Sequence, residues 1–166
     1  MTTNATTAKT STTFEIETMS DRDLNHARRT GLDASGNPIA YVTMTGGQPL
    51  RCCLRDAEPG EAAILFGYEP KLPASPYREI GAVYAHASAC AGPDSRTDYP
   101  AAWRGRPQVL RAYDRRGWIH AARVHEGHNP ESAIADLLAD PAVEQIHSRN
   151  VAYGCYMFTI RPVAVD

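Results

Sequence analysis

The chain has 166 residues, of which 43% are apolar and 22% charged, and its formal net charge is −2 at pH 7. This length corresponds to one domain, and the composition is that of a globular protein able to bury a core. The near-neutral balance argues against a nucleic-acid binder, which concentrates positive charge on one face. No apolar run approaches the roughly 20 residues that a membrane-spanning helix needs.

The N-terminal segment, residues 1–13, is rich in threonine and lacks the apolar stretch of a secretory signal. We therefore predict a disordered tail there, followed by a single domain over residues 14–166. Without an export signal, the protein is expected to be cytoplasmic and its cysteines reduced. The cysteines are Cys52, Cys53, Cys90 and Cys155, and their spacing matches no paired C-x2-C zinc pattern.

The first half of the predicted domain combines one short helix with several strands. The helix is predicted over Asp21–Thr30, because Ser20 is a suitable N-cap and Gly31 suits a left-handed C-cap. Strands are predicted from runs of β-forming residues bounded by turn residues. They are Phe14–Glu17, Ile39–Thr45, Leu50–Arg55, Ala62–Tyr68 and Ala82–Ala87.

Strand side chains alternate between faces, so the predicted strand Leu50–Arg55 divides into two sets. One face carries Leu50, Cys52 and Leu54, and we expect it to point toward the core. The other face carries Arg51, Cys53 and Arg55.

The second half begins with a long predicted loop, Ser88–Gly105, of a length that is usually functional or mobile. A hairpin of Gln108–Tyr113 and Trp118–Val124 follows, and then a helix opened by Asn129-Pro130. The strands Val143–Arg149 and Cys155–Arg161 close the domain. The predicted fold class is α+β, with a mainly antiparallel sheet of about seven or eight strands and two helices.

Several short motifs occur along the domain, and together they resemble those of a bacterial family known as domain of unknown function 1203. They are Cys53–Glu61 (CLRDAEPGE), Ser75-Pro76-Tyr77 with Gly81, a strand ending in His86 with Cys90 after it, Leu110–Asp114 (LRAYD), and His147-Ser148-Arg149 with Tyr153-Gly154-Cys155. The resemblance covers roughly residues 35–161. It implies a shared fold and extent, and the family name implies no activity.

The chain departs from the family pattern at two places. Leu50 stands where the pattern places another cysteine two residues before Cys52, and Ala82-Val83 stands where Gly-Pro or a similar pair is expected.

The closing hairpin brings a base, a cation and a thiol close together. With Asn150–Gly154 as its turn, Arg149 is expected opposite Cys155 and His147 opposite Met157, and paired residues point to the same face. That polar face would carry His147, Arg149, Cys155, Met157 and Arg161, whereas Ile146, Tyr156, Phe158 and Ile160 would form the core face. The polar face either lines a pocket or is the solvated outer face of the sheet, and the sequence leaves both open.

Other residue sets allow further interpretations. His86 and Cys90 could contribute to a zinc site with Cys53, His147 or Cys155, but none of these residues form a ligand knuckle, so no residue is assigned to a metal.

Arg111 and Tyr113 share a strand face that suits an anionic ligand or surface ion pairs. The turn carboxylates Asp56, Glu58, Glu61 and Asp114 are expected to serve turn geometry. No nucleotide-binding motif occurs.

The favoured function is a small-molecule-binding domain, and specifically a cofactor-independent enzyme that uses acid–base or nucleophilic chemistry on an anionic metabolite. The catalytic candidates are His147, His86, Cys155 and Cys53, and the ligand-binding candidates are Arg149, Arg111, Tyr113, Arg55 and Tyr153. The alternatives are a non-catalytic ligand- or protein-binding domain and a Cys/His metal-binding domain. No cofactor, nucleic acid or membrane is expected as a partner, and the substrate, reaction and oligomeric state stay open.

Overall fold

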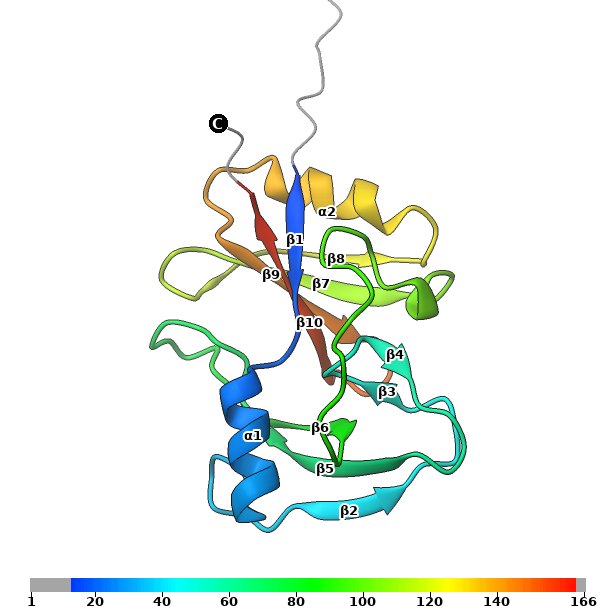
Figure 1. The fold of residues 1–166 in the computed structure, drawn as a ribbon. Helices are drawn as coiled ribbons and strands as arrows, with labels where there is room; N and C mark the ends of the chain where they lie inside the picture. The colour runs from blue at the N-terminus through cyan, green and yellow to red at the C-terminus, as the bar shows by residue number, and fades with distance from the viewer. Residues whose placement is uncertain (1–12, 164–166) are drawn as a thin grey trace, which may run out of the picture.

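The computed structural model describes residues 13–163 of the chain. Two five-stranded sheets lie one above the other in Figure 1, and each is accompanied by one α-helix. The α+β class with two helices is confirmed, but the prediction of one sheet of seven or eight strands is wrong. The predicted tail lies outside the described residues except for Thr13. No helix in the described part of the chain is long and apolar enough to cross a membrane.

The upper sheet is antiparallel throughout and has the strand order β1-β10-β9-β7-β8. Its strands are β1 (Phe14–Glu17), β7 (Gln108–Tyr113), β8 (Ile119–His125), β9 (Gln145–Asn150) and β10 (Tyr156–Pro162). Helix α2 (Pro130–Leu138) buries Ile134, Leu137 and Leu138 against this sheet, in one core with Leu110 and Phe158. The predicted hairpin of β7 and β8 is confirmed.

The lower sheet has the strand order β2-β5-β6-β3-β4. Its strands are β2 (Ala40–Thr43), β3 (Pro49–Leu50), β4 (Arg55–Asp56), β5 (Ala62–Tyr68) and β6 (Gly81–His86). One bridge in it is parallel, between Leu50 and Tyr84, and it places the end of β3 beside β6. Helix α1 (Asp21–Thr30) packs Leu24 and Ala27 into the core of this sheet.

The two helices begin in different ways. Helix α1 matches its prediction at both ends: the Ser20 hydroxyl accepts from the backbone N–H of Asp23, and Gly31 has φ of +71°. Helix α2 begins with Pro130 at its first position, as expected. Asn129 occupies the N-cap position, as predicted, but it has φ of +48° and its side chain makes no capping hydrogen bond.

The predicted strand Leu50–Arg55 is wrong, because residues 51–54 form a turn. The backbone N–H of Leu54 donates to the Leu50 carbonyl at 2.9 Å, and Leu54 has φ of +57°. Chain reversal at this residue breaks the alternation of faces: Cys52 and Cys53 both point into the lower core, whereas Leu54 packs into the upper one. A non-glycine residue in this left-handed region costs about 1–2 kcal/mol.

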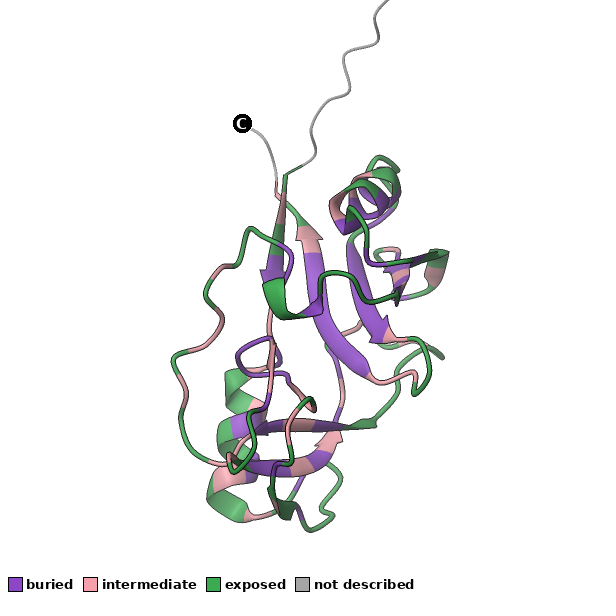
Figure 2. Ribbon diagram, turned by 90° about the vertical axis from the view of Figure 1, so that its right-hand side faces the viewer, coloured by how far each residue is buried: buried purple, intermediate pink, exposed green. Residues whose placement is uncertain are grey.

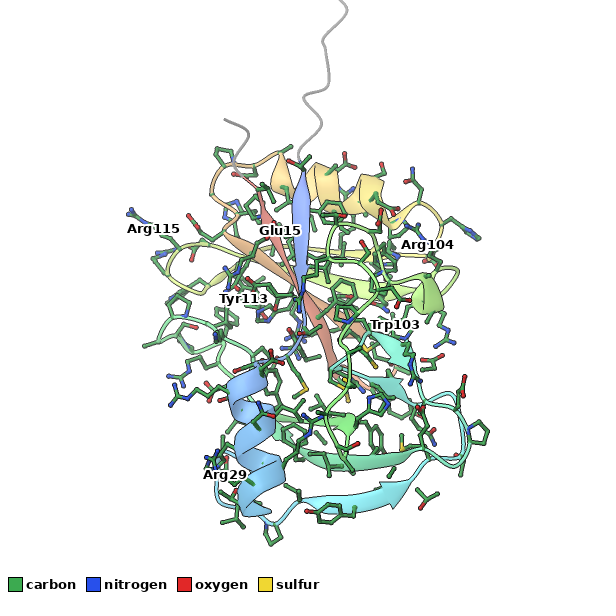
Figure 3. All side chains as sticks on the ribbon, in the orientation of Figure 1. Glu15, Arg29, Trp103, Arg104, Tyr113 and Arg115 are labelled. Atoms are coloured by element: carbon green, nitrogen blue, oxygen red, sulfur yellow. The ribbon has the colours of Figure 1, made fainter. Side chains whose placement is uncertain are left out.

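The predicted long loop contributes buried side chains rather than forming a purely external segment. It contains the short 3-10 helix η1 (Ala101–Trp103), and Tyr99 and Trp103 are almost completely buried. Trp103 stacks on Phe158, with ring centroids 5.9 Å apart, and its indole N–H donates to Asp56 at 2.9 Å. Trp103 lies beside β4 in Figure 3, so this loop connects the upper core to the lower sheet.

Burial is concentrated in β5, β7, β9 and β10, whereas the outer strands β2 and β8 and most connecting segments are exposed or half-buried (Figure 2). The guanidinium of Arg51 is among the buried groups, and its Nε–H donates to the Tyr156 carbonyl at 2.8 Å. The ring centroids of Tyr156 and Tyr68 are 5.5 Å apart. The start of β10 therefore packs against residues of the lower sheet.

The closing hairpin is present, but its predicted register is wrong. Tyr156, not Cys155, pairs with Arg149, and Thr159, not Met157, pairs with His147. An irregularity between Tyr156 and Phe158 inserts one extra residue into β10. The pairing of Tyr156 with Arg149 already differs from the prediction by one residue, and the bulge adds a second residue for the pairs that follow it.

Candidate functional site

The structure distributes the predicted site residues among three places. His86, Cys53 and Arg55 lie at the end of β6 and in the β3–β4 turn, and His147, Arg149, Arg111 and Tyr113 lie together on the upper sheet. Cys155 and Tyr153 lie in the turn between β9 and β10. Of the three residues predicted to share one face, His147 and Arg149 do so on β9, whereas Cys155 lies in the turn that follows this strand.

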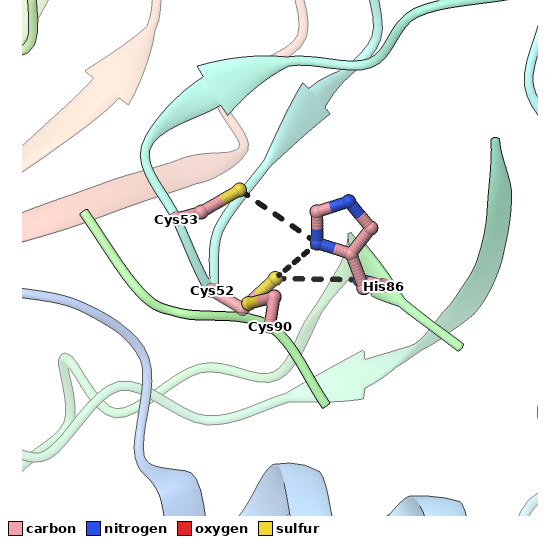
Figure 4. A group of neighbouring side chains, drawn as sticks. All are labelled: Cys52, Cys53, His86 and Cys90. Carbon is pink, nitrogen blue, oxygen red and sulfur yellow. Dashed lines mark hydrogen bonds between the residues drawn. The ribbon is translucent and has the colours of Figure 1, made fainter. Parts of the chain in front are cut away.

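The first site, which we call the Cys/His cluster, consists of Cys52, Cys53, His86 and Cys90 (Figure 4). One potential ligand atom of each residue lies within 4.8 Å of all the others. Cys52 and Cys53 come from the β3–β4 turn, His86 is the last residue of β6, and Cys90 follows it by four positions. The parallel pairing of β3 with β6 brings these segments together.

Two sulfur atoms of the cluster lie close to one ring nitrogen of His86. Its Nδ1 atom is 3.3 Å from the Cys52 Sγ and 3.7 Å from the Cys53 Sγ. The backbone N–H of His86 also donates to the Cys52 sulfur, at 3.3 Å. An N–H donor directed at a sulfur favours its thiolate form, which is the form that binds metals and attacks electrophiles.

The three thiols differ in acidity because they contact one another. The hydrogen bond with Cys53 and burial together raise the pKa of Cys52 far above its usual range. The same hydrogen bond lowers the pKa of Cys53, and Arg55 adds to this effect through its charge and its backbone N–H. Burial raises the pKa of Cys90, against the effect of the Gly92 backbone N–H. Cys53 is thus the thiol that ionises most readily.

The other ring nitrogen of His86 faces a carboxylate. Its Nε2 atom is 3.2 Å from Glu61 Oε1, and Arg55 binds both oxygens of Glu61, at 2.6 and 2.9 Å. These Arg55 hydrogen bonds hold the pKa of Glu61 far below its usual range, so the carboxylate is ionised. When Nε2–H donates to Glu61, Nδ1 presents its lone pair to the sulfurs. Metal-binding histidines typically have such a carboxylate partner.

Helix α1 braces the segment that carries the last cysteine. The guanidinium of Arg28 donates to the His86 carbonyl at 2.9 and 3.2 Å and to the Ser88 carbonyl at 2.6 Å. Sequence reasoning missed Cys52, Glu61 and Arg28 as parts of this site. The adjacent cysteines and the H-x3-C spacing were visible, but the assumed strand placed Cys52 and Cys53 on opposite faces.

The donor set of the cluster is the one that zinc prefers. Tetrahedral zinc has Zn–S distances of about 2.3 Å and Zn–N distances of about 2.0 Å, which puts neighbouring ligand atoms roughly 3.4–3.8 Å apart. The two His86–cysteine distances already lie near this range, and the largest separation in the cluster is 4.8 Å or less. A contraction of about 1 Å would therefore complete a four-coordinate site.

The second site, which we call the polar layer, consists of five residues on one face of the upper sheet. Gln145, His147 and Arg149 alternate along β9, and Tyr113 and Arg111 of β7 pair with the first two. The interpretation of this face as solvated is wrong, because His147 is 0% and Arg149 5% exposed. Arg149 and Arg111 both bind Glu79, the latter at 3.0 Å.

The imidazole of His147 is held neutral by its surroundings. Burial, followed by the charges of Arg149, Arg161 and Arg111, lowers its pKa to about 3. Its ring contacts those of Tyr113 and Tyr156, with centroids 4.7 and 5.5 Å away. A pKa of about 3 is far from the range where general acid–base catalysis works best, and the catalytic role of His147 stays a prediction.

This lowered pKa leads to a testable dependence of stability on pH. The unfolded chain binds a proton at His147 near pH 6.5, whereas the folded chain does so only near pH 3. The stabilising effect is therefore complete above about pH 6.5 and is lost as the pH falls toward 3, at up to ~1.4 kcal/mol per pH unit. The free energy of unfolding of His147→Gln, measured by denaturant unfolding, should therefore depend less steeply on pH over this interval than that of the wild type. The control variant His26→Gln, at an exposed position, should keep the wild-type dependence of stability on pH. The same pH dependence in both variants and in the wild type would show that it does not come from His147.

The remaining candidates lie apart from both sites. The Cys155 thiol donates to the Tyr153 carbonyl at 3.8 Å, and the Tyr153 side chain extends from the turn, 84% exposed. Their predicted roles in catalysis and ligand binding stay predictions.

Comparison with known proteins gives one match. A family model described as "Protein of unknown function (DUF1203)" matches residues 47–161, which include the whole Cys/His cluster and the whole polar layer. This match confirms the resemblance inferred from the motifs. Neither the curated proteins nor the solved structures contain a match to the chain.

Proposed function

The chain belongs to the DUF1203 family, and we propose that it is a metal-binding domain that holds one Zn²⁺ ion at the Cys/His cluster. The observation that carries this proposal is the mutual approach of four ligand atoms within 4.8 Å. Three thiolates and an imidazole select a soft or borderline cation in tetrahedral geometry, and zinc is the metal that such sites hold most often.

The surroundings of the cluster support this choice. Three thiolates and Zn²⁺ together carry a charge of −1, and Arg28 and Arg55 lie next to the cluster as positive groups. Glu61 supplies the carboxylate that orients His86, with its own position fixed by Arg55. Outer partners of this kind typically account for 10–100-fold in metal affinity.

The number of protein ligands indicates what the metal does. Four protein ligands leave no open position for water or substrate, which is typical of a structural site. The ion would join the β3–β4 turn, the end of β6 and the segment that carries Cys90. We therefore propose a stabilising role for zinc in this domain.

Metal content tests the proposal directly. Protein purified under reducing conditions should contain about one zinc per chain by elemental analysis, and Cys53→Ser and Cys90→Ser should each lose most of it because only three ligands remain. The matched control is Cys155→Ser, which changes a cysteine outside the cluster and should retain the metal. Circular dichroism shows whether each variant folds.

A cobalt-substituted sample gives a second measurement that does not depend on metal retention during purification. Co²⁺ should produce thiolate-to-cobalt charge-transfer absorption in the wild type and in Cys155→Ser, and much less of it in Cys53→Ser. A reduced, folded wild-type chain that takes up neither zinc nor cobalt would overturn the proposal. So would thiol titration showing that the cluster cysteines form a stable disulfide under these conditions.

A further inference from the structure

The polar layer contains buried polar atoms that the described residues leave unpaired. They are Tyr113 Oη, Gln145 Oε1, Arg149 Nε and the ring nitrogens of His147, one of which lies close enough to the Lys71 carbonyl for this carbonyl to act on the pKa of the ring. None of these four residues is more than 5% exposed. Folded proteins pair about 90% or more of their buried polar groups, because an unpaired group loses its hydration without replacement. Four atoms without any partner on one sheet face therefore indicate a site that receives a polar ligand.

The charges around these atoms indicate the sign of that ligand. Three arginines lie close enough to His147 to lower its pKa, namely Arg149, Arg161 and Arg111, and glutamates pair with all three: Glu79 with Arg149 and Arg111, and Glu17 with Arg161. The carboxylate that meets two of these arginines comes from Glu79, just before β6. Glu79 is 46% exposed, whereas Arg149 is buried, so the carboxylate reaches the layer from its solvent side. The arginine pair thus already holds one carboxylate, supplied by the chain itself.

We propose that the polar layer binds a small hydroxycarboxylate whose carboxylate takes the place of the Glu79 side chain on Arg149 and Arg111. Arginine binds planar carboxylates through paired N–H donors. Neutral His147 offers one donor and one acceptor, and Tyr113 offers a hydroxyl, which together suit the hydroxyl of the ligand. This inference goes beyond the proposed zinc function and uses none of its residues.

Two surface clefts reach the margins of the layer, one at Gln145 and one at Glu79. A cleft of about 380 Å³ is lined by Gln145 and Arg161 together with Lys71 and Leu72. Glu79 lines another cleft, together with Ser75 and Arg78. A ligand that enters beside the segment between β5 and β6 would meet Glu79 first and would compete with its carboxylate for the two arginines.

Removal of the internal carboxylate provides the test. Propionate, which matches the Glu79 side chain, should bind Glu79→Ala at least about 10-fold more tightly than it binds the wild type, because its competitor is gone. NMR signals of the His147 ring report binding at this site. Adding Arg111→Gln, a change at a partly exposed residue, should reduce the gained affinity about 10-fold or more. Glu69→Ala is the matched control: it removes a carboxylate paired with Arg78 and should create no such affinity.

The choice between ligand classes is tested with the same Glu79→Ala protein. Lactate should bind several-fold more tightly than propionate, and Tyr113→Phe combined with Glu79→Ala should bring the two affinities together. Equal affinity for propionate in the wild type and in Glu79→Ala would overturn the site. Equal affinity for lactate and propionate would overturn the hydroxycarboxylate class, and so would tighter binding of inorganic phosphate than of either acid. None of these outcomes depends on the zinc content.

Discussion

Removal of zinc with a chelator should lower the free energy of unfolding by about 4 kcal/mol or more. A ligand that binds only the folded chain stabilises it by RT ln(1 + [L]/Kd), which is ~4 kcal/mol when free zinc is 1,000 times Kd. Domains of this size are stable by only about 5–15 kcal/mol, so the loss should be large. Denaturant unfolding of the zinc-loaded and chelated protein measures it, with Cys155→Ser as a variant that should respond like the wild type.

Hydrogen exchange of the zinc-loaded and chelated protein should show which segments the proposed ion stabilises. Amide hydrogen exchange is expected to speed up most in the β3–β4 turn and around Cys90, because the proposed ion would connect these segments. Hydrogen exchange in the β7–β8 hairpin, which contributes no ligand, should speed up less when the metal is removed. A chelator that leaves both stability and exchange unchanged would contradict a structural role for the metal.

Trp103→Ala should destabilise the domain by about 3–5 kcal/mol, the usual cost of deleting a fully buried large aromatic side chain. Trp103 is 0% exposed, stacks on Phe158 and donates its indole N–H to Asp56. Its loss would remove the contact between the long loop, the upper core and β4. Thermal or denaturant unfolding of the zinc-loaded protein provides the measurement.

Two variants separate the contributions of Trp103. Trp103→Phe keeps an aromatic ring near Phe158 but loses the hydrogen bond to a carboxylate, so it should cost roughly 1.5–3 kcal/mol. Trp118→Ala makes the same substitution at a tryptophan that is 43% exposed, and it should cost less than about 1 kcal/mol. Similar losses for Trp103→Ala and Trp118→Ala would show that the long loop does not depend on its buried tryptophan.

Features with local causes were predictable from the sequence. Helix α1 follows from Ser20, whose side chain caps its first turn, and from Gly31, whose left-handed backbone ends it. The β7–β8 hairpin follows from two β-forming runs around a short turn. The α+β class follows from the same local patterns, and the family motifs identified the family.

Tertiary structure alone decided how the sheets divide and where the reactive residues point. The bulge between Tyr156 and Phe158 set the partner of His147, and the left-handed conformation of Leu54 turned Cys52 and Cys53 to the same side. Neither feature has a periodic signature in the sequence.

The candidate metal site shows this division most clearly. The sequence by itself supplied three cysteines and one histidine of the right chemistry, and it marked His86 and Cys90 as neighbours. Cys52 and His86 are 34 positions apart, and only the parallel pairing of β3 with β6 brings them into contact. Long-range strand pairing depends on the packing of the whole chain, so the local pattern around each residue did not determine the cluster.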